Sequence, residues 1–400
     1  MHTAAPRLPS TWRVVPALGV MEIFAWGTSY YLPAVLAEPI RADTGWPLPW
    51  IVGALSLGML VAGIAAPRIG LMIGRGNGRA MLAAGCGLMA LGLALIGAAG
   101  WLPMFVIGWL VIGLGMGACL YDAAFAALTH IYGASARPII TRLTLWGGFA
   151  SPICWPISAF LEALLGWRGT CFTYAGVMLL LCLPLVLFAL PPGARRPEPT
   201  LAGAAAERVA VAGRERATFL LYAVIMTIGG ATASTMSVHL LTLLQARGFS
   251  LAEAVTVAAV VGPAQVASRL IEMAGRGRHD ALWTLGAAVA MMAAGLALLI
   301  AGWLWAGVPL ALYGAGTGVY SIARGTVPLR LFGPARYAQI IGRVARPNLV
   351  AQALAPSLAA FAVARQGPDM MLDMLLGITC LNVLVFAVLV RVVGRERPAA

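Results

Sequence analysis

Residues Gly113–Arg142 read GLGMGACLYDAAFAALTHIYGASARPIITR, and the stretch returns in altered form at Gly314–Arg343 as GAGTGVYSIARGTVPLRLFGPARYAQIIGR. Aligned without a gap, three glycines and the last arginine of the first copy fall on those of the second, 201 positions later. Residues 67–76, PRIGLMIGRG, match 268–277, SRLIEMAGRG, at the same offset. Two matches at one offset of half the chain length predict two structural copies in the same orientation.

The composition is that of a membrane protein. Of the 400 residues, 61% are hydrophobic and 10% are charged, whereas a soluble domain has about 25% charged residues. A helix needs about 20 apolar residues to cross the hydrocarbon core, so the chain has room for about a dozen spans. We therefore predict an all-α membrane protein of twelve transmembrane helices, arranged as two six-helix bundles related by a pseudo-two-fold axis along the membrane normal.

The apolar segments divide evenly between the two halves. A Pro-, Gly- and charge-rich stretch separates them, so we predict an N-terminal transmembrane domain at 1–190, a cytoplasmic linker at 191–216 and a C-terminal transmembrane domain at 217–400. The predicted spans are 14–38, 49–72, 79–100, 103–131, 139–165, 169–190, 217–243, 250–273, 281–301, 304–328, 338–363 and 370–392.

The charged residues exclude several function classes. All 27 basic residues are arginine, and a P-loop or a Schiff-base enzyme needs lysine. The sequence has no HExxH or GxSxG motif, and its six cysteines read as small buried hydrophobes, so we expect no enzyme, cofactor or metal. The net charge of +13 does not indicate nucleic acid, because the arginines lie between apolar spans, where they set orientation.

The arginines are distributed unequally between the two sides of the membrane. If the N-terminus is cytoplasmic, only Arg41, Arg168, Arg247 and Arg365 fall outside, and the others in loops fall inside. We therefore expect both termini in the cytoplasm of a multi-pass plasma membrane protein, with a bacterial inner membrane as the expected location.

Two local motifs resemble those of the major facilitator superfamily, and the resemblance covers essentially the whole chain. The loop 70–79, GLMIGRGNGR, is similar to the family's loop motif, and Gly166-Trp167-Arg168 is similar to a common feature before the sixth span. The chain departs from the pattern at Gly74, where the family has an acidic residue, and at Trp109, where it has an arginine. The resemblance implies the fold of this superfamily and a transporter whose first, fourth, seventh and tenth spans line a central cavity.

Two carboxylates lie on cavity spans at similar depth. Glu22 on the first span and Asp122 on the fourth both lie roughly 12 to 14 Å from the cytoplasmic face, at 1.5 Å per residue. A carboxylate in hydrocarbon costs about 2.5 to 3.5 kcal/mol and normally faces a cavity or a partner. We predict proton coupling through Glu22 and Asp122; the alternative is a structural pair with an arginine or a backbone group.

Other polar and aromatic residues on these spans are candidates for the substrate cavity. Trp26 and Ser29 share the helix face of Glu22, although tyrosines 30 and 31 beside them also fit an interfacial anchor. His239 is a proton-relay candidate or a packing residue. Arg324 recognises an anionic solute or extends to the headgroups. The candidate cavity residues are Trp26, Ser29, Tyr121, His239, Tyr320 and Arg324.

A third group lies near the cytoplasmic ends of the spans. Arg142 and Arg343 are equivalent under the repeat, which favours a role in closing the inner gate over substrate contact. The predicted gate and loop residues are Arg68, Gly70, Arg75, Arg79, Arg142, Arg269, Glu272 and Arg343.

These observations predict a secondary active transporter that moves a small organic solute by alternating access, coupled to protons and with efflux favoured. Uptake of a small carboxylate, or a sensor of the same fold that transports nothing, are the alternatives. The expected partners are the solute, protons and the lipid bilayer, without nucleic acid, and the expected state is a monomer.

Overall fold

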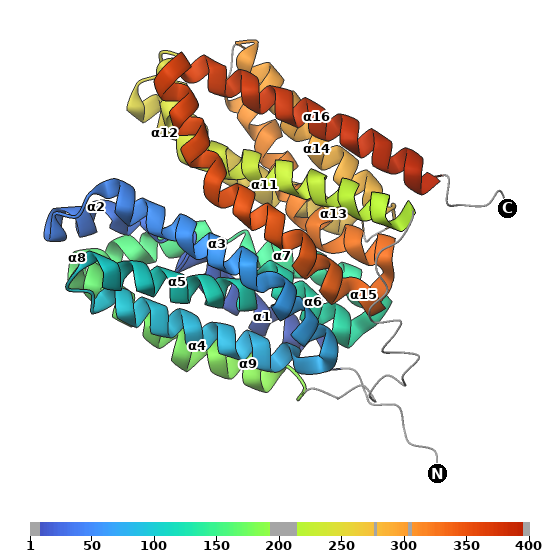
Figure 1. Cartoon of the computed structure of the whole chain (residues 1–400), viewed down its shortest axis with the longest axis horizontal. Helices are drawn as coiled ribbons and strands as arrows, with labels where there is room; N and C mark the ends of the chain where they lie inside the picture. Colours follow the sequence, from blue (N-terminus) through green and yellow to red (C-terminus); the bar gives the residue numbers. More distant parts are fainter. Residues whose placement is uncertain (1–8, 193–213, 276–277, 303–305, 395–400) are drawn as a thin grey trace. The chain divides into compact units, whose positions relative to one another are not determined.

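The computed structural model describes residues 9–192, 214–275, 278–302 and 306–394, and every regular element in these ranges is helical (Figure 1). The helices before the predicted linker are α1 (Thr11–Gly27), α2 (Pro33–Thr44), α3 (Leu48–Met72), η1 (Ile73–Asn77), α4 (Gly78–Gly97), α5 (Leu102–Cys119), α6 (Tyr121–Tyr132), η2 (Gly133–Ser135), α7 (Ala136–Gly147), α8 (Ala150–Val177), η3 (Met178–Cys182) and α9 (Leu183–Ala189). Those after it are α11 (Arg214–Ala246), α12 (Leu251–Ala258), α13 (Val261–Ala274), α14 (Ala281–Ile300), α15 (Gly307–Gln366) and α16 (Pro368–Gly394).

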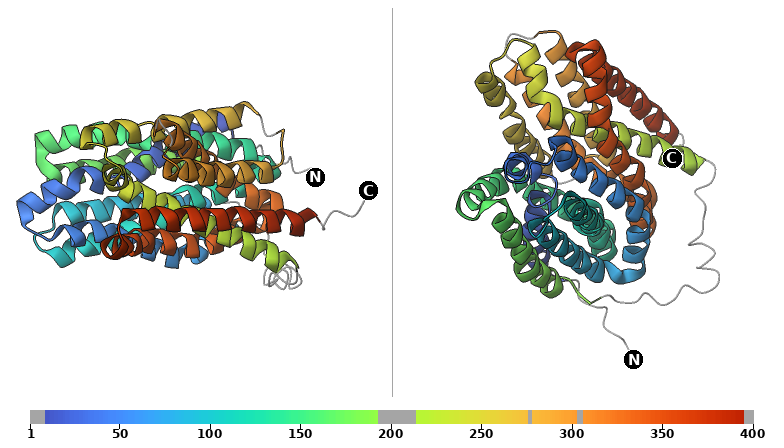
Figure 2. Two further views of the ribbon diagram at one scale, coloured as in Figure 1. Left: turned by 90° about the horizontal axis from the view of Figure 1, so that it is seen from above. Right: turned by 60° about the vertical axis from the view of Figure 1, so that its left-hand side comes forward.

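The chain folds into two compact units. The first comprises Met1–Arg195 with Pro328–Arg343, and the second comprises Arg196–Val327 with Val344–Ala400. The helices of the first unit, blue to green, lie side by side when viewed nearly along their axes (right-hand view of Figure 2). Most of the predicted linker lies outside the described residues, and the predicted domain limits at 190 and 217 stay predictions.

Seven helical stretches in the described part of the chain are long and apolar enough to cross a membrane. Several contain more than one predicted span, because the helix continues through a turn at a glycine with positive φ. Gly166 (φ 67°) lies between the fifth and sixth predicted spans, and Gly333 (φ 72°) lies between the tenth and eleventh. The chain is thus a multi-pass membrane protein; the number of twelve spans stays a prediction.

Helix α5, which carries the first glycine triplet, packs closely on α3 and α4. A Cβ at Gly113 would overlap the carbonyl oxygen of Gly58 in α3, and one at Gly115 would lie 3.0 Å from that of Gly85 in α4. Small residues at such contacts let two helix backbones approach, which is how membrane helices gain packing energy. These glycines therefore let α5 lie close to α3 and α4.

Two of the predicted spans contain a break. In the first span, α1 ends at Gly27, a turn follows, and α2 begins at Pro33. In the fourth span, α5 ends at Cys119 and α6 begins at Tyr121, because Leu120 adopts an extended backbone (φ −77°, ψ 179°). Proline favours the first turn of a new helix, since it has no N–H group to leave unpaired. Hydropathy alone did not predict either break, because both breaks lie within apolar sequence.

In the second unit, α16 packs on both α11 and α14 (Figure 1). Side-chain groups tie these helices to backbone carbonyls: the amide of Asn382 in α16 donates to Ile225 O at 3.3 Å. Tyr222 of α11 is fully buried, and its hydroxyl donates to Arg324 O in α15 at 2.9 Å. These bonds fix α15 and α16 against α11.

Candidate functional site

Glu22 lies inside the first unit, at the middle of the packing around α1. Its side chain has no exposed surface, and α1 packs on α5, α7 and α8. Cys119 is the last residue of α5 and directly precedes the break at Leu120. One turn after Glu22, Trp26 of the same helix contacts Tyr121, the first residue after this interruption of the fourth span.

Asp122 lies on the other side of the same break. It is half-buried and belongs to the first turn of α6, where the helix has its positive dipole end. Backbone N–H groups in a first turn have no intrahelical partner, so a carboxylate is favoured there. Asp122 therefore lies at the junction between α5 and α6, and Glu22 lies on α1, whose Trp26 contacts Tyr121 at the same junction.

An aromatic cluster adjoins this junction. The rings of Trp26 and Tyr121 have centroids 5.3 Å apart, and Tyr121 stacks on Phe125 at 5.1 Å. Trp26 also contacts Tyr30 at 5.8 Å and Tyr31 at 6.3 Å, which lie in the turn between α1 and α2. The aromatic residues therefore connect the break in the first span with the break in the fourth.

Tyr121 is fixed from α7. Its hydroxyl donates to Thr144 O at 3.2 Å, and its ring lies against Gly147, where a Cβ would overlap the hydroxyl. Sequence reasoning selected Tyr121 but missed Thr144, Phe125 and Cys119. The GACLYDAAF stretch from 117 to 125 lacks any motif that marks a break, so no signal in the single sequence pointed to this contact set.

Two polar atoms near this cluster have no hydrogen-bond partner in the described part of the chain. They are Trp26 Nε1 and the hydroxyl of Thr28, and both atoms are buried. Buried polar groups are normally hydrogen-bonded, so such donors are candidates for contact with a solute. Ser29 differs, because its buried hydroxyl donates to Ala25 O at 2.5 Å and is used by the helix itself.

The fold is that of a known transporter superfamily. The pattern described as Major Facilitator Superfamily matches residues 18–356. The chain belongs to the Major Facilitator Superfamily. It is therefore a secondary membrane transporter and not an enzyme, which confirms the resemblance drawn from the sequence.

Solved structures of this superfamily share its fold. They include the human organic anion transporter MFSD10 (16% identity, TM-score 0.70, 94% of this chain and 100% of that chain) and the E. coli fucose:proton symporter FucP (17%, 0.69, 96% and 100%). The proton:xylose symporter XylE has 13% identity and a TM-score of 0.73 over 94% of each chain. No curated protein matches the sequence.

In this superfamily transporter, the predicted cavity residues of the second unit are held by backbone carbonyls. His239 Nε2 lies 2.9 Å from Pro356 O, and the hydroxyl of Tyr320 donates to Met226 O at 2.5 Å. Arg324 is half-buried in α15. The structure places these three in the second unit, whereas Glu22, Trp26 and Tyr121 belong to the first.

Among the predicted gate residues of the transporter, Arg269 and Glu272 on α13 have partners. Arg269 is buried and its Nε donates to Gly318 O at 3.4 Å. Glu272 pairs with His279 at 2.9 Å and accepts a hydrogen bond from the hydroxyl of Thr284 at 2.8 Å. Sequence reasoning selected Glu272 but missed both of its partners, which follow it by seven and twelve residues.

The other predicted gate residues are mostly at the surface. Arg68, Arg75, Arg142 and Arg343 are exposed, and Arg79 is half-buried. Gly70 packs directly on the segment of α15 that belongs to the first unit, where a Cβ would overlap Ala338 O. The gate function of this group stays a prediction.

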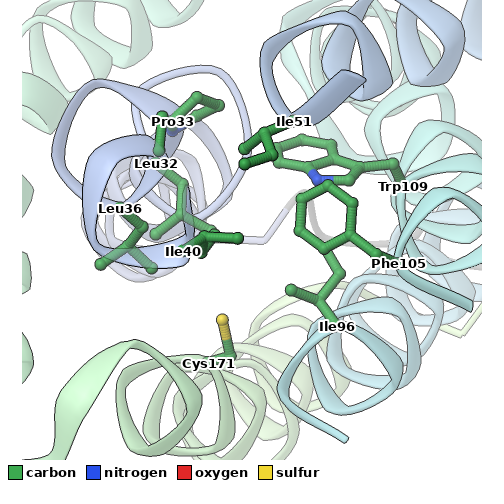
Figure 3. A pocket seen from close by; sticks show the side chains of 10 residues that line it. Leu32, Pro33, Leu36, Ile40, Ile51, Ile96, Phe105, Trp109 and Cys171 are labelled. Atoms are coloured by element: carbon green, nitrogen blue, oxygen red, sulfur yellow. The ribbon is translucent and has the colours of Figure 1, made fainter. Parts of the chain in front are cut away.

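Trp109, which replaces the family's arginine, lies in the apolar interior of the first unit. It lines a cavity of about 10 Å³ together with Leu36, Ile40, Phe105 and Cys171 (Figure 3). That volume holds at most about one water molecule, so the cavity is no solute site. The transporter therefore has an aromatic packing residue where the family pattern has a cation.

No group of three or more His, Cys, Asp or Glu side chains that could hold a metal ion occurs in the ranges that the structure describes. The buried thiols and carboxylates near the junction are thus spread among several helices.

Proposed function

We propose that the transporter is proton-coupled, with Glu22 as its principal proton site and Asp122 assisting, and that it moves a small organic solute by alternating access. The observation that carries the proposal is the full burial of Glu22 in α1, the helix whose Trp26 contacts Tyr121 at the interrupted fourth span. A charged carboxylate inside protein is costly, so its proton occupancy depends on how the surrounding helices pack.

The break supplies a way to change that packing. Interrupted membrane helices in transporters form at solute and ion sites, and their end groups and dipoles face the cargo. Movement of α6 relative to α5 alters the surroundings of Asp122 directly, and it reaches α1, which carries Glu22, through the contact of Tyr121 with Trp26. Protonation and helix movement are then linked, and a bound solute biases both.

The aromatic cluster supports an amphipathic or cationic solute. Trp26 lies one turn after Glu22 in α1, its ring contacts that of Tyr121, which precedes Asp122, and aromatic rings attract cations. The unpartnered Trp26 Nε1 adds a donor for a polar group of the solute. Export of such compounds is favoured in this proposal.

A second candidate function rests on Arg324. This arginine lies half-buried in α15, and a guanidinium in that setting binds a carboxylate in bidentate fashion. It favours uptake of a small organic anion. MFSD10 is described as an organic anion transporter, whereas FucP and XylE are described as proton symporters for fucose and xylose. A sensor of the same fold would bind the solute without moving it.

We further propose a bacterial inner membrane location, a monomer, and both termini in the cytoplasm. The support is the excess of arginines on one side of the predicted spans. A reporter that works only in the cytoplasm should be active when it is fused to either terminus. Activity of a fused reporter that works only in the periplasm would contradict the orientation.

The transport proposal is tested with purified protein in proteoliposomes that contain a pH-sensitive dye. Amines, lipophilic drugs, organic anions and sugars are added one at a time, and the change in internal pH is recorded. We expect a signal with amines or amphipathic drugs. A signal with carboxylates alone supports the uptake alternative, and solute binding without flux supports the sensor.

A further inference from the structure

We propose that the first unit binds one net-anionic phospholipid in a groove on α3, α4 and α5, with its phosphate on Arg68. The groove has a volume of about 410 Å³ and is separate from the carboxylate and aromatic site. Its walls are apolar, and Arg68 is the one charged side chain in its lining.

The groove results from how these three helices pack. Both α3 and α4 pack closely on α5, through glycines such as Gly113 and Gly115, but they make few contacts with each other (Figure 1). The gap between them leaves Leu114 of α5 39% exposed as the floor. We infer that lipid fills this gap, because no side chain in the described part of the first unit covers it.

The dimensions fit one acyl chain. Lining residues on α3 run from Val61 to Met72, which is about 16 Å at 1.5 Å per residue. That is about half of the roughly 30 Å hydrocarbon core, the depth of one leaflet. Exposed Ile64 on one wall, with Leu114 on the floor, presents methyl groups to such a chain.

The charge at the groove's end selects the headgroup. Arg68 is exposed, one turn before the end of α3, and forms no ion pair or side-chain hydrogen bond with any residue that the structure describes. A guanidinium binds a phosphate with two parallel hydrogen bonds. An arginine near a helix end also extends toward the headgroup level.

The turn after α3 adds positive charge and contains no acidic residue. It reads IGRGN over 73–77 and leads into Arg79, so Arg75 and Arg79 follow Arg68 at the same end of the groove. Gly74 stands where an acidic residue would offset them. A zwitterionic lipid brings its own cation to this surface, whereas a net-anionic headgroup does not, so the anionic lipid is preferred.

The corresponding arginine of the second unit does not offer such a site. Arg269 is 201 positions after Arg68, but its side chain is only 6% exposed and its Nε donates to Gly318 O. The repeat therefore predicts one lipid of this kind for the chain, and not two.

The test is native mass spectrometry of the full-length protein in detergent, titrated with phosphatidylglycerol or with phosphatidylcholine of the same acyl chains. We expect one phosphatidylglycerol to bind more tightly than the first phosphatidylcholine. Arg68→Gln should weaken its binding about tenfold and abolish the preference, as expected for loss of a charge-assisted phosphate contact. Arg391→Gln, which removes an exposed arginine at the end of α16, should change neither.

A second variant tests the chain-binding part of the groove. Ala84 is an exposed lining residue of α4, so Ala84→Phe fills the groove from its wall and should weaken binding of both lipids. Ala290→Phe, at an exposed position of α14, is the control. Equal phosphatidylglycerol preference in Arg68→Gln and Arg391→Gln, or equal lipid binding in the two Phe variants, would overturn the proposal. Neither readout depends on transport.

Discussion

Arg168 and Arg247 bind the ends of corresponding helices in the two units, and each pairs with an acidic residue from another segment. Arg168 Nη1 donates to Ala99 O at 2.7 Å, beyond the end of α4, and its Nη2 lies 3.6 Å from Asp43. Arg247 Nη1 donates to Leu299 O at 2.8 Å, near the end of α14, and its Nε lies 3.4 Å from Asp369. Asp369 stands 201 positions after Arg168, so the acid in the second unit occupies the position that the arginine has in the first.

The two units share the hydrogen bond from an arginine to carbonyls at a helix end. Carbonyls at a helix C-terminus lack intrahelical partners, and a cation there also favours the helix dipole. The arginine meets this need in each unit, whichever segment carries it, and the acid balances its charge. The pairs themselves are largely exposed, so their direct contribution is small.

The first prediction concerns the contact of Arg168 with the end of α4. Arg168→Gln should lower the free energy of unfolding by about 1 to 3 kcal/mol, since it leaves carbonyls of Gly97 and Ala99 without their donor. Asp43→Asn should cost about 0 to 1 kcal/mol, because it removes only an exposed charge. Thermal unfolding in detergent measures both. A larger loss for Asp43→Asn than for Arg168→Gln would contradict the assignment.

The second prediction concerns helix approach in the first unit. Gly113→Ala should destabilise the protein by about 1 to 3 kcal/mol, because its Cβ would overlap the backbone of Gly58 and push α5 from α3. Gly87→Ala is the control, since a Cβ there meets nothing within 4 Å and alanine is the better helix former. Comparable unfolding temperatures for the two variants would show that the close approach is not required.

The third prediction separates binding from packing at Trp26. Trp26→Phe keeps a ring beside Tyr121 but removes Nε1, which has no partner in the described part of the chain. We expect a rise in KM of about 5- to 15-fold, the effect of one lost hydrogen bond, with little change in unfolding temperature. Unchanged KM and a clear loss of stability would assign Trp26 to packing alone.

The fourth prediction concerns the Glu272 cluster in the second unit. His279→Gln should reduce stability by less than about 1 kcal/mol, because the hydroxyl of Thr284 still donates to Glu272. His279→Gln combined with Thr284→Val should cost more than the sum of the single changes, since Glu272, only 14% exposed, then loses both partners. A double-mutant cycle on unfolding temperature measures this coupling, and strict additivity would contradict it.

The sequence was sufficient to predict the helical membrane fold and the superfamily, because long apolar segments and a repeat at one offset constrain a chain strongly. The proton-coupling role of Glu22 and Asp122 stays a prediction. The sequence did not predict the break at Leu120, because an extended residue between two apolar helices leaves no hydropathy signal. We did not predict the contacts of Asp43, Thr144 and His279 for another reason. Contacts between residues on different helices cannot be read from spacing in a single sequence.

The same limit applies to Ser29. Helical spacing placed Trp26 and Ser29 on the face of Glu22, but α1 ends at Gly27, so Ser29 lies in the following turn and donates to Ala25 O. Trp26 lies in α1 together with Glu22 and contacts Tyr121. The prediction assumed a continuous helix, but α1 ends two residues before Ser29.

The central claim is proton coupling through Glu22, and the most direct test compares two transport modes in proteoliposomes. We expect Glu22→Gln to retain exchange of labelled solute across the membrane but to lose accumulation driven by a pH gradient. Glu38→Gln, which removes an exposed carboxylate on α2, is the matched control and should retain both. Accumulation by Glu22→Gln at the level of the Glu38→Gln control would contradict the claim.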